Sequence, residues 1–99
     1  MKLNEFISLE AIYIDIDADS KKLVFKEIAS IISKKSSLRP SLIIEKLNER
    51  EKLGSTGVGN GVAIPHTKIE GIKKTYVIFL KLKNAVDFSS SDKKEVDLV

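Results

Sequence analysis

The sequence predicts a small α/β domain, because two helix-type patterns stand among several short strand-type runs. Apolar residues recur at helical spacing between residues 21 and 34 and again between Pro40 and Glu51. The run Thr75–Leu82 is rich in β-branched and aromatic residues, which favour strands. The chain has 99 residues, which is enough for one domain and no more.

The N-terminal part predicts a strand followed by a helix. Ile12, Ile14 and Ile16 alternate with polar residues, as in a short half-buried strand or an extended entry segment. Asp19 or Ser20 can then cap the helix, since either side chain accepts a hydrogen bond from a first-turn N–H. The helix should run to about residue 34, with an apolar stripe at Val24, Ile28, Ile31 and Ile32.

A second helix and two further strands are predicted beyond it. Pro40 suits the first turn of the helix, and Gly54 is a natural stop. Val62–Ile64 reads as a strand that ends at a proline. In the loop that follows Thr75–Leu82, we expect Phe88 to pack against the core. The last strand is expected at Glu95–Val99, where the chain stops, so we expect the domain to be incomplete at its C-terminus; a short edge strand is the alternative.

Composition excludes several classes of function. The 17 Lys and Arg residues outnumber 14 Asp and Glu, but the lysines are spread along the chain, so we expect no nucleic-acid binding. The absence of cysteine rules out disulfides, zinc–thiolate sites and a cysteine nucleophile. A single histidine cannot build a multi-histidine metal site. Because no apolar run approaches the roughly 20 residues that cross a membrane, we expect a soluble domain with no membrane insertion of its own.

The candidate functional residues lie at either end of a glycine-rich loop. His66 is the only histidine, and it follows Pro65 at the end of a short apolar run. A lone histidine at a strand end is often only a satisfied polar group. Here, however, Pro65 fixes the backbone that leads into it. Arg50 ends the helix that feeds the same loop, and it suits an arriving anion because guanidinium binds phosphate through two N–H groups.

The glycine spacing in that loop could also indicate a nucleotide site. Gly57, Gly59 and Gly61 superficially match a dinucleotide-binding fingerprint, which requires a strand before it and a helix after it. Here a helix comes first and a strand follows, and no Gly-Lys-Ser/Thr closes the loop as in a P-loop. A nucleotide site is therefore the weaker interpretation.

The segment from Arg50 to His66 resembles the active-site signature of the type-2 EIIA domains of the bacterial phosphoenolpyruvate:sugar phosphotransferase system. Its sequence is Arg-Glu-x-x-Gly-Ser-Thr-Gly-Val-Gly-Asn-Gly-Val-Ala-Ile-Pro-His. The order of elements agrees over residues 1–99, so we expect a single EIIA type-2 domain. The resemblance implies an α/β fold in which helices flank both faces of a mixed sheet. Thr67 departs from the pattern, since many members carry glycine there.

The resemblance also implies roles for individual residues. His66 would accept a phosphoryl group from the phosphocarrier protein HPr and pass it to a cysteine on an EIIB domain, which can be fused with EIIC. Arg50 would stabilise the phosphate, and no cofactor or metal is needed because the group travels between side chains. The phosphate-site loop would comprise Thr56, Gly57, Gly59, Asn60 and Gly61. The two polar members of that loop are equally candidates for holding its shape.

The signature leaves two functions open. The first interpretation is fructose-type sugar uptake, by a cytoplasmic domain that is linked to a membrane permease through EIIB and EIIC. The alternative is a nitrogen-type regulatory EIIA whose phosphorylation state controls binding to partner proteins. A structural domain with a vestigial site is disfavoured by the intact Arg50, Pro65 and His66. Family members also carry a second active-site histidine beyond the signature, and this sequence has none.

Overall fold

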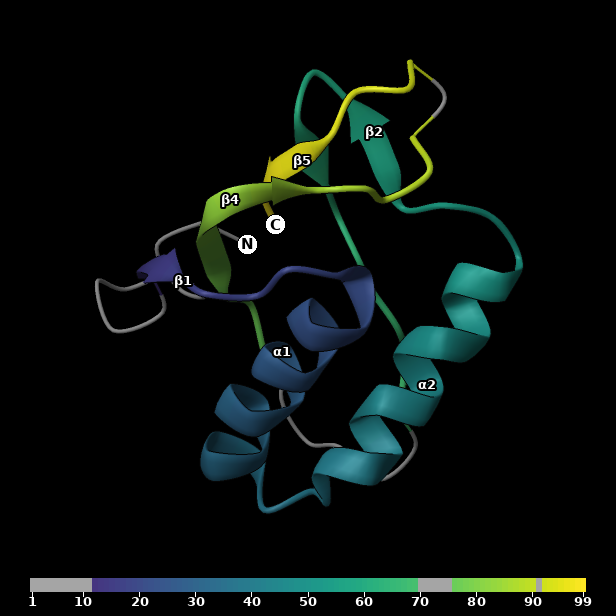
Figure 1. Cartoon of the computed structure of the whole chain (residues 1–99). Helices are drawn as coiled ribbons and strands as arrows, with labels where there is room; N and C mark the ends of the chain where they lie inside the picture. Colours follow the sequence, from purple (N-terminus) through teal and green to yellow (C-terminus); the bar gives the residue numbers. More distant parts are fainter. Residues whose placement is uncertain (1–11, 70–75, 91) are drawn as a thin grey trace, which may run out of the picture.

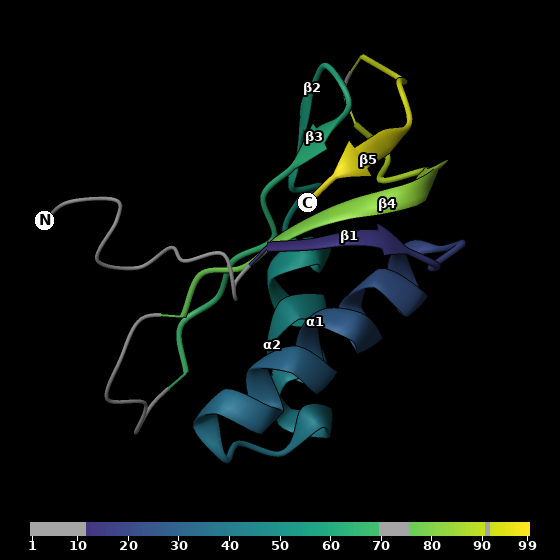
Figure 2. The same cartoon turned by 90° about the vertical axis from the view of Figure 1, so that its left-hand side faces the viewer.

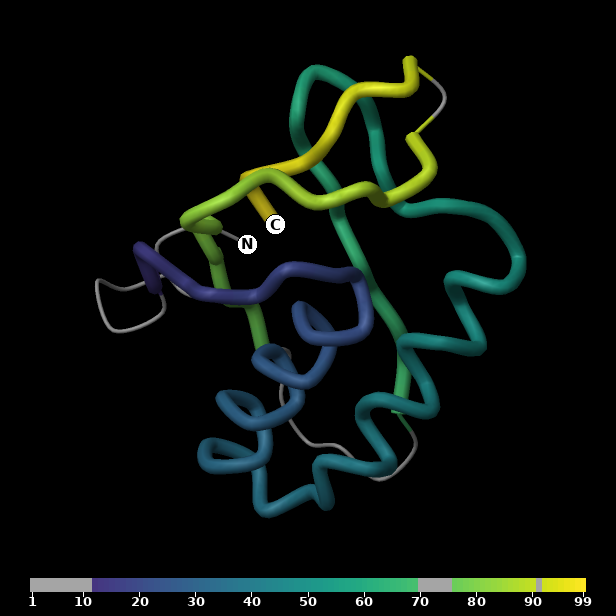
Figure 3. The backbone as a smooth tube through the Cα atoms, in the orientation of Figure 1, coloured from purple at the N-terminus to yellow at the C-terminus, as the bar shows by residue number. Residues whose placement is uncertain are grey.

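The computed structural model describes residues 12–69, 76–90 and 92–99 (Figure 1). In chain order its elements are β1 (Ile12–Ile16), α1 (Lys21–Ser36), α2 (Pro40–Lys52), β2 (Gly57–Gly59), β3 (Val62–Ala63), β4 (Phe79–Val86) and β5 (Val96–Leu98). Figure 3 shows that the yellow C-terminal segment runs beside the teal segment that holds β2 and β3, although the two are far apart in sequence.

The strands form one mixed sheet in the order β1-β4-β5-β3-β2. The β1–β4 and β3–β5 pairs are parallel, while the β4–β5 and β2–β3 pairs are antiparallel. Both described helices lie on the same face of this sheet (Figure 2). The predicted α/β class and mixed sheet are therefore confirmed. The expected helices on both faces are seen on one face only within the described ranges.

The core lies between the two helices and the sheet. Along β4, Leu80 and Leu82 are fully buried while the intervening Lys81 is exposed, so the strand has one apolar and one solvated face. Phe25 of α1 packs edge to face against Phe88, with ring centroids 6.1 Å apart. The prediction that Phe88 packs against the core is confirmed, because its side chain is completely buried.

The ends of both helices follow from local sequence signals. Ser20 caps α1, and its hydroxyl accepts a hydrogen bond from the Leu23 N–H at 3.2 Å. The helix continues to Ser36, slightly beyond the predicted end. Pro40 is the first residue of α2, and Gly54 follows that helix, as predicted. No helix in the described part of the chain is long and apolar enough to span a bilayer.

The prediction for the main strand was wrong in its limits. Thr75–Leu82 was expected to be the strand, whereas β4 begins at Phe79 and continues to Val86; residue 75 lies outside the described residues. The reason is pairing with neighbours. Phe79 lies opposite Ile12 near the start of β1, and Val86 pairs with β5 at the far end of β4. Strand limits therefore depend on available partners as well as on propensity.

A hairpin occupies part of the segment that was predicted as a loop. Gly57–Gly59 forms β2 and pairs with β3 across a two-residue turn at Asn60 and Gly61. The φ angles of these turn residues are 56° and 80°. Positive φ at both positions is what a type I′ turn requires, and Asn-Gly is its usual sequence. The Asn-Gly pair was therefore the hairpin signal within the glycine-rich segment.

Three polar residues join α1, α2 and the start of β2, and we call them the Glu51 junction (Lys21, Glu51 and Thr56). The Lys21 Nζ atom donates to Glu51 Oε2 at 2.7 Å, and the Thr56 hydroxyl donates to Glu51 Oε1 at 2.7 Å. The Thr56 N–H also donates to this carboxylate, at 3.1 Å from Oε2. Burial alone would raise the pKa of the Glu51 carboxyl. The hydrogen bonds from Lys21 and Thr56 outweigh burial and hold that pKa below its ordinary value of 4.5.

We expect the Glu51 junction to make the stability of the fold sensitive to acid. The pKa of Glu51 is lower in the folded protein than in the unfolded chain. The Glu51 charge therefore contributes its full share of the free energy of unfolding above pH 4.5, and this share is lost as the pH falls through the lower folded-state pKa. Glu51→Gln removes the charge at constant size and should lower the free energy of unfolding at neutral pH by about 1–3 kcal/mol. Urea unfolding at a series of pH values should show the two proteins converging as the pH falls.

The matched control is Glu45→Gln, a substitution at an exposed position of the same helix. It should unfold like the wild-type protein at every pH. If the free energies of unfolding of the wild type and Glu51→Gln differ by the same amount down to strongly acidic pH, the assigned role of the charge is contradicted.

Candidate functional site

His66 is exposed and follows the short strand β3 and Pro65. Its Nδ1 atom lies 2.9 Å from the backbone oxygen of Ile64. Because a carbonyl oxygen can only accept, this contact places the ring proton on Nδ1. The other ring nitrogen, Nε2, then keeps its lone pair. In the neutral form of the ring, the nucleophilic nitrogen is therefore Nε2.

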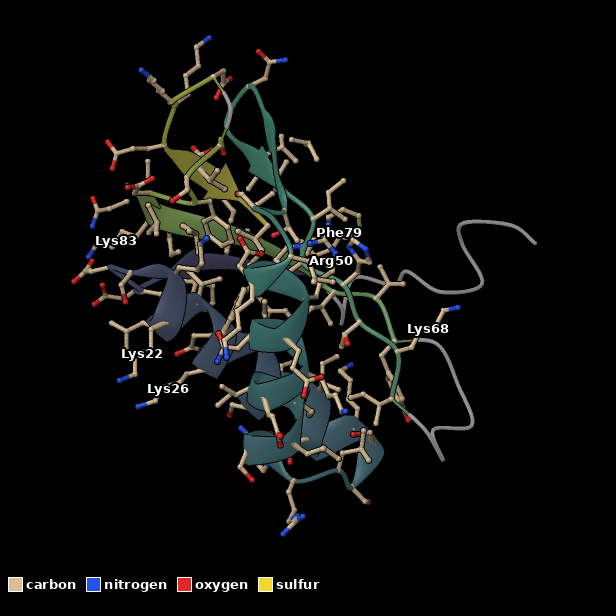
Figure 4. The ribbon with its side chains drawn as sticks, turned by 90° about the vertical axis from the view of Figure 1, so that its right-hand side faces the viewer. Lys22, Lys26, Arg50, Lys68, Phe79 and Lys83 are labelled. Carbon is tan, nitrogen blue, oxygen red and sulfur yellow. The ribbon has the colours of Figure 1, made fainter. Side chains whose placement is uncertain are left out.

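Arg50 shares an open hollow with His66. It lies in the last turn of α2, and Figure 4 shows it at the end of that helix next to the sheet. Its Nη1 atom donates to the backbone oxygen of Gly54 at 2.8 Å, which restrains the side chain against the start of the loop. The other N–H groups of the guanidinium can donate hydrogen bonds to an anion. The structure thus brings together the two residues that the sequence singles out.

Other side chains that line the hollow were not anticipated from the sequence. Lys46 and Lys68 add two further cations, and Figure 4 shows Lys68 extending from the segment that follows β3. Glu49 is the acidic residue that lines the hollow, and its Oε2 atom lies 3.5 Å from Nζ of Lys46. Leu53 also lines the hollow and is 85% exposed. A signal for Lys46 was present, since it lies one helical turn before Arg50 on the same face.

The five predicted phosphate-site loop residues do not line this hollow. Thr56 is buried, and its hydroxyl is bound to Glu51. The Asn60 N–H donates to Asp92 at 2.9 Å, and the Gly61 oxygen accepts from the N–H groups of Asp97 and Leu98 in β5. Gly57 lies against Ser90, and Gly59 faces Asp92. Their contacts are with the rest of the fold, and a role for them at a phosphate stays a prediction.

The hydrogen bonds between Asp92 and two backbone N–H groups, those of Asn60 and Lys94, lower the pKa of the Asp92 carboxyl. Asp92 therefore keeps its charge in mild acid and continues to hold the tip of the β2–β3 hairpin. The hydrogen bond from Asn60 attaches the hairpin tip to Asp92, which precedes β5 in the chain. The hairpin residues do not line the hollow that holds His66.

The arrangement at the hollow suits an anionic electrophile. A lone pair on Nε2 can attack, and the nearby guanidinium can neutralise negative charge that accompanies the attacked group. Histidine serves as a nucleophile of this kind in covalent catalysis. Within the described ranges, no group of three metal-ligating side chains gathers. An imidazole nucleophile beside a guanidinium is chemically suited to accept an anionic group such as a phosphoryl group.

Comparison with known proteins gives the family of this chain. Residues 5–99 match the family model described as "Phosphoenolpyruvate-dependent sugar phosphotransferase system, EIIA 2". A nitrogen regulatory protein of Bradyrhizobium diazoefficiens is 37% identical over 99 residues, which cover all of this chain and 65% of that protein. The fructose-specific EIIABC component of Bacillus subtilis is 31% identical over 100 residues, which cover all of this chain and 16% of that protein.

A solved structure gives the same result for the fold. The crystal structure of the nitrogen regulatory protein IIA-Ntr from Neisseria meningitidis superposes with a TM-score of 0.91 at 40% identity. The superposition covers 97% of this chain and 66% of the other. This chain therefore spans about two thirds of these regulatory relatives. With a family match over nearly the whole sequence, the chain belongs to the EIIA 2 family of the phosphoenolpyruvate-dependent sugar phosphotransferase system, whose domains are phosphotransfer components.

Proposed function

We propose that this chain is a regulatory phosphocarrier of the nitrogen type. His66 accepts a phosphoryl group from phospho-HPr, and the phosphorylation state controls binding to partner proteins. The observation that carries the proposal is the exposed imidazole with its Nε2 lone pair, beside Arg50 in one hollow. The relatives at 37% and 40% identity are both nitrogen regulatory proteins, and this supports regulation over uptake.

Sugar uptake is the second candidate function. Its support is the fructose-specific relative, which is 31% identical to this chain. In that case His66 would pass its phosphoryl group to the cysteine of an EIIB domain. The acceptor side of the reaction therefore distinguishes the two functions, because both begin with the same phosphorylated histidine.

The proposed transfer is a direct displacement at phosphorus. The Nε2 lone pair of His66 forms a new N–P bond while the P–N bond of the donor phosphohistidine breaks. The departing imidazole of the donor keeps the electron pair of that bond. The proton on Nδ1 of His66 stays in place, held by the Ile64 oxygen. Arg50 stabilises the charge on the equatorial phosphoryl oxygens, which is the main demand that phosphoryl transfer makes on a protein.

The surroundings of His66 suit a protein donor. The donor must bring phosphorus to within roughly 3 Å of Nε2 for in-line attack. The hollow is open, so the reacting side chain of a second protein can reach it. Lys68 adds positive charge that attracts a phosphorylated partner and speeds the encounter, while the charge of Lys46 is paired with Glu49. On this proposal the chain acts in the cytoplasm, together with its phosphocarrier donor.

We expect His66→Ala to abolish phosphorylation while the fold survives, because His66 is exposed and, among the described residues, its ring bonds only to a nearby backbone oxygen. The measurement is intact mass after incubation with phosphoenolpyruvate, Enzyme I and HPr. The wild-type chain should gain an acid-labile phosphate, about 80 Da, and the variant should gain none. Asn48→Ala, an exposed change on α2, is the control that should react like the wild type. Full phosphorylation of His66→Ala would overturn the assignment.

The same phosphorylated chain separates regulation from uptake. It is mixed with a fructose-type EIIB domain, and the mass of each protein is followed. Retention of the phosphate on His66 is expected for a regulatory protein. Rapid transfer to the EIIB cysteine would instead establish the uptake function and overturn the regulatory one.

We expect Arg50→Ala to slow phosphorylation of His66 by about 10²–10³-fold, the usual cost of losing one preorganised donor of charge stabilisation. Arg50→Lys should recover only part of the rate, since lysine keeps the charge but lacks the planar fork. Arg39→Ala, at the exposed start of α2, is the matched arginine control. Rates come from quench-flow mass analysis. An unchanged rate in a folded Arg50→Ala protein would remove Arg50 from the site.

A further inference from the structure

A continuous series of hydrogen bonds connects Glu51 to the ring of His66. The Glu51 carboxylate accepts from the N–H and the hydroxyl of Thr56. The Thr56 backbone oxygen accepts from the Ile64 N–H at 2.9 Å. The Ile64 oxygen, in turn, accepts from His66 Nδ1 at 2.9 Å. Each hydrogen bond restrains the residue whose backbone group forms the next hydrogen bond in the series.

The first member of this series is held firmly. The Glu51 side chain is only 10% exposed, and Lys21 of α1 donates to it at 2.7 Å. Lys21 also lies 5.1 Å from the centre of the Phe88 ring, which belongs to the core. The carboxylate therefore has a fixed position relative to both helices. A buried charge that is paired and hydrogen-bonded in this way is a rigid anchor for its partners.

Neighbouring residues at the end of α2 hold two points of the same loop. Arg50 donates to the Gly54 oxygen, and Glu51 accepts from Thr56. Consecutive helical residues point in different directions, so one side chain lies at the hollow while the other lies at the junction. The segment between α2 and β2 is thereby fixed at both ends, and Thr56 extends this restraint to Ile64, two residues before His66.

We propose that Glu51 is a positioning residue for His66, which acts through Thr56 and Ile64 to keep the ring proton on Nδ1 and to present Nε2 to the phosphoryl donor. The expected effect of Glu51 on the rate of phosphorylation rests on the proposed phosphocarrier function. The structural content of the inference, the tautomer and orientation of the ring, can be measured on the unphosphorylated chain. The hydrogen bond on one ring nitrogen decides which nitrogen is free, so a displaced Ile64 oxygen would release the ring to both tautomers.

The test uses nitrogen-15 NMR of the His66 ring in the unphosphorylated protein, at a pH where the imidazole is neutral. The wild-type ring should show a protonated Nδ1 and an unprotonated Nε2. In Glu51→Gln the two ring signals should move toward each other as both tautomers become populated. The rate of phosphorylation from phospho-HPr should fall by roughly 10- to 100-fold, the size of effect expected for a displaced reacting group.

A second variant keeps the inference testable if Glu51→Gln does not fold. Thr56→Val deletes the hydroxyl, leaves the Lys21–Glu51 pair in place, and should shift the tautomer balance in the same direction. Glu45→Gln is the matched control on the same helix and should leave both the ring signals and the rate unchanged. Folded Glu51→Gln and Thr56→Val proteins that keep the wild-type ring signals would overturn the inference.

The two readouts separate this inference from the proposed function. If the ring signals move but the wild-type chain is never phosphorylated, the positioning role stands and the phosphocarrier function fails. If the wild-type chain is phosphorylated but the ring signals of both variants stay unchanged, the positioning role fails alone. A loss of stability without any change of tautomer would show that Glu51 acts only in the fold.

Discussion

The partly buried ion pair between Lys21 and Glu51 is the interaction on which the rest of the structure depends. The two residues are separated by 30 positions, and their contact joins the start of α1 to the end of α2. Through Thr56 the same carboxylate fixes the beginning of the β2–β3 hairpin. Because both partners are partly desolvated, losing one of them would leave the other charge half-buried and without its partner, which is destabilising. The junction therefore also sets the geometry of the segment that carries the histidine.

The chemistry of the site follows from an exposed histidine on a rigid support. His66 is accessible, so a second protein can reach it, yet its ring is restrained by the Ile64 oxygen. The cations around it, with Arg50 foremost, favour a phosphoryl group without enclosing it. A phosphocarrier has to gain and release its group on contact with other proteins. An open hollow with a fixed nucleophile meets this requirement better than a deep pocket would.

Sequence patterns predicted those parts of the structure that depend on neighbours along the chain. The cap at Ser20, the helix start at Pro40 and the helical stripes are local signals, and the structure has them. The signature also named Arg50 and His66, which the structure places at one hollow. The limits of β4 depend on partner strands elsewhere in the sheet, so the propensity of its own residues does not predict them. The same is true of Asn60, whose backbone is held by Asp92 from 32 positions away.

The identity of the phosphorylated ring nitrogen is the most direct test of this account. The chain, labelled with nitrogen-15, is phosphorylated through phospho-HPr, and long-range proton–nitrogen correlations then assign the nitrogen that carries phosphorus. The account predicts phosphorylation at Nε2 of His66, with Nδ1 still protonated and bonded to the Ile64 oxygen. Phosphorylation at Nδ1 would require that bond to break, and it would contradict the claim that the fold presents Nε2 as the acceptor.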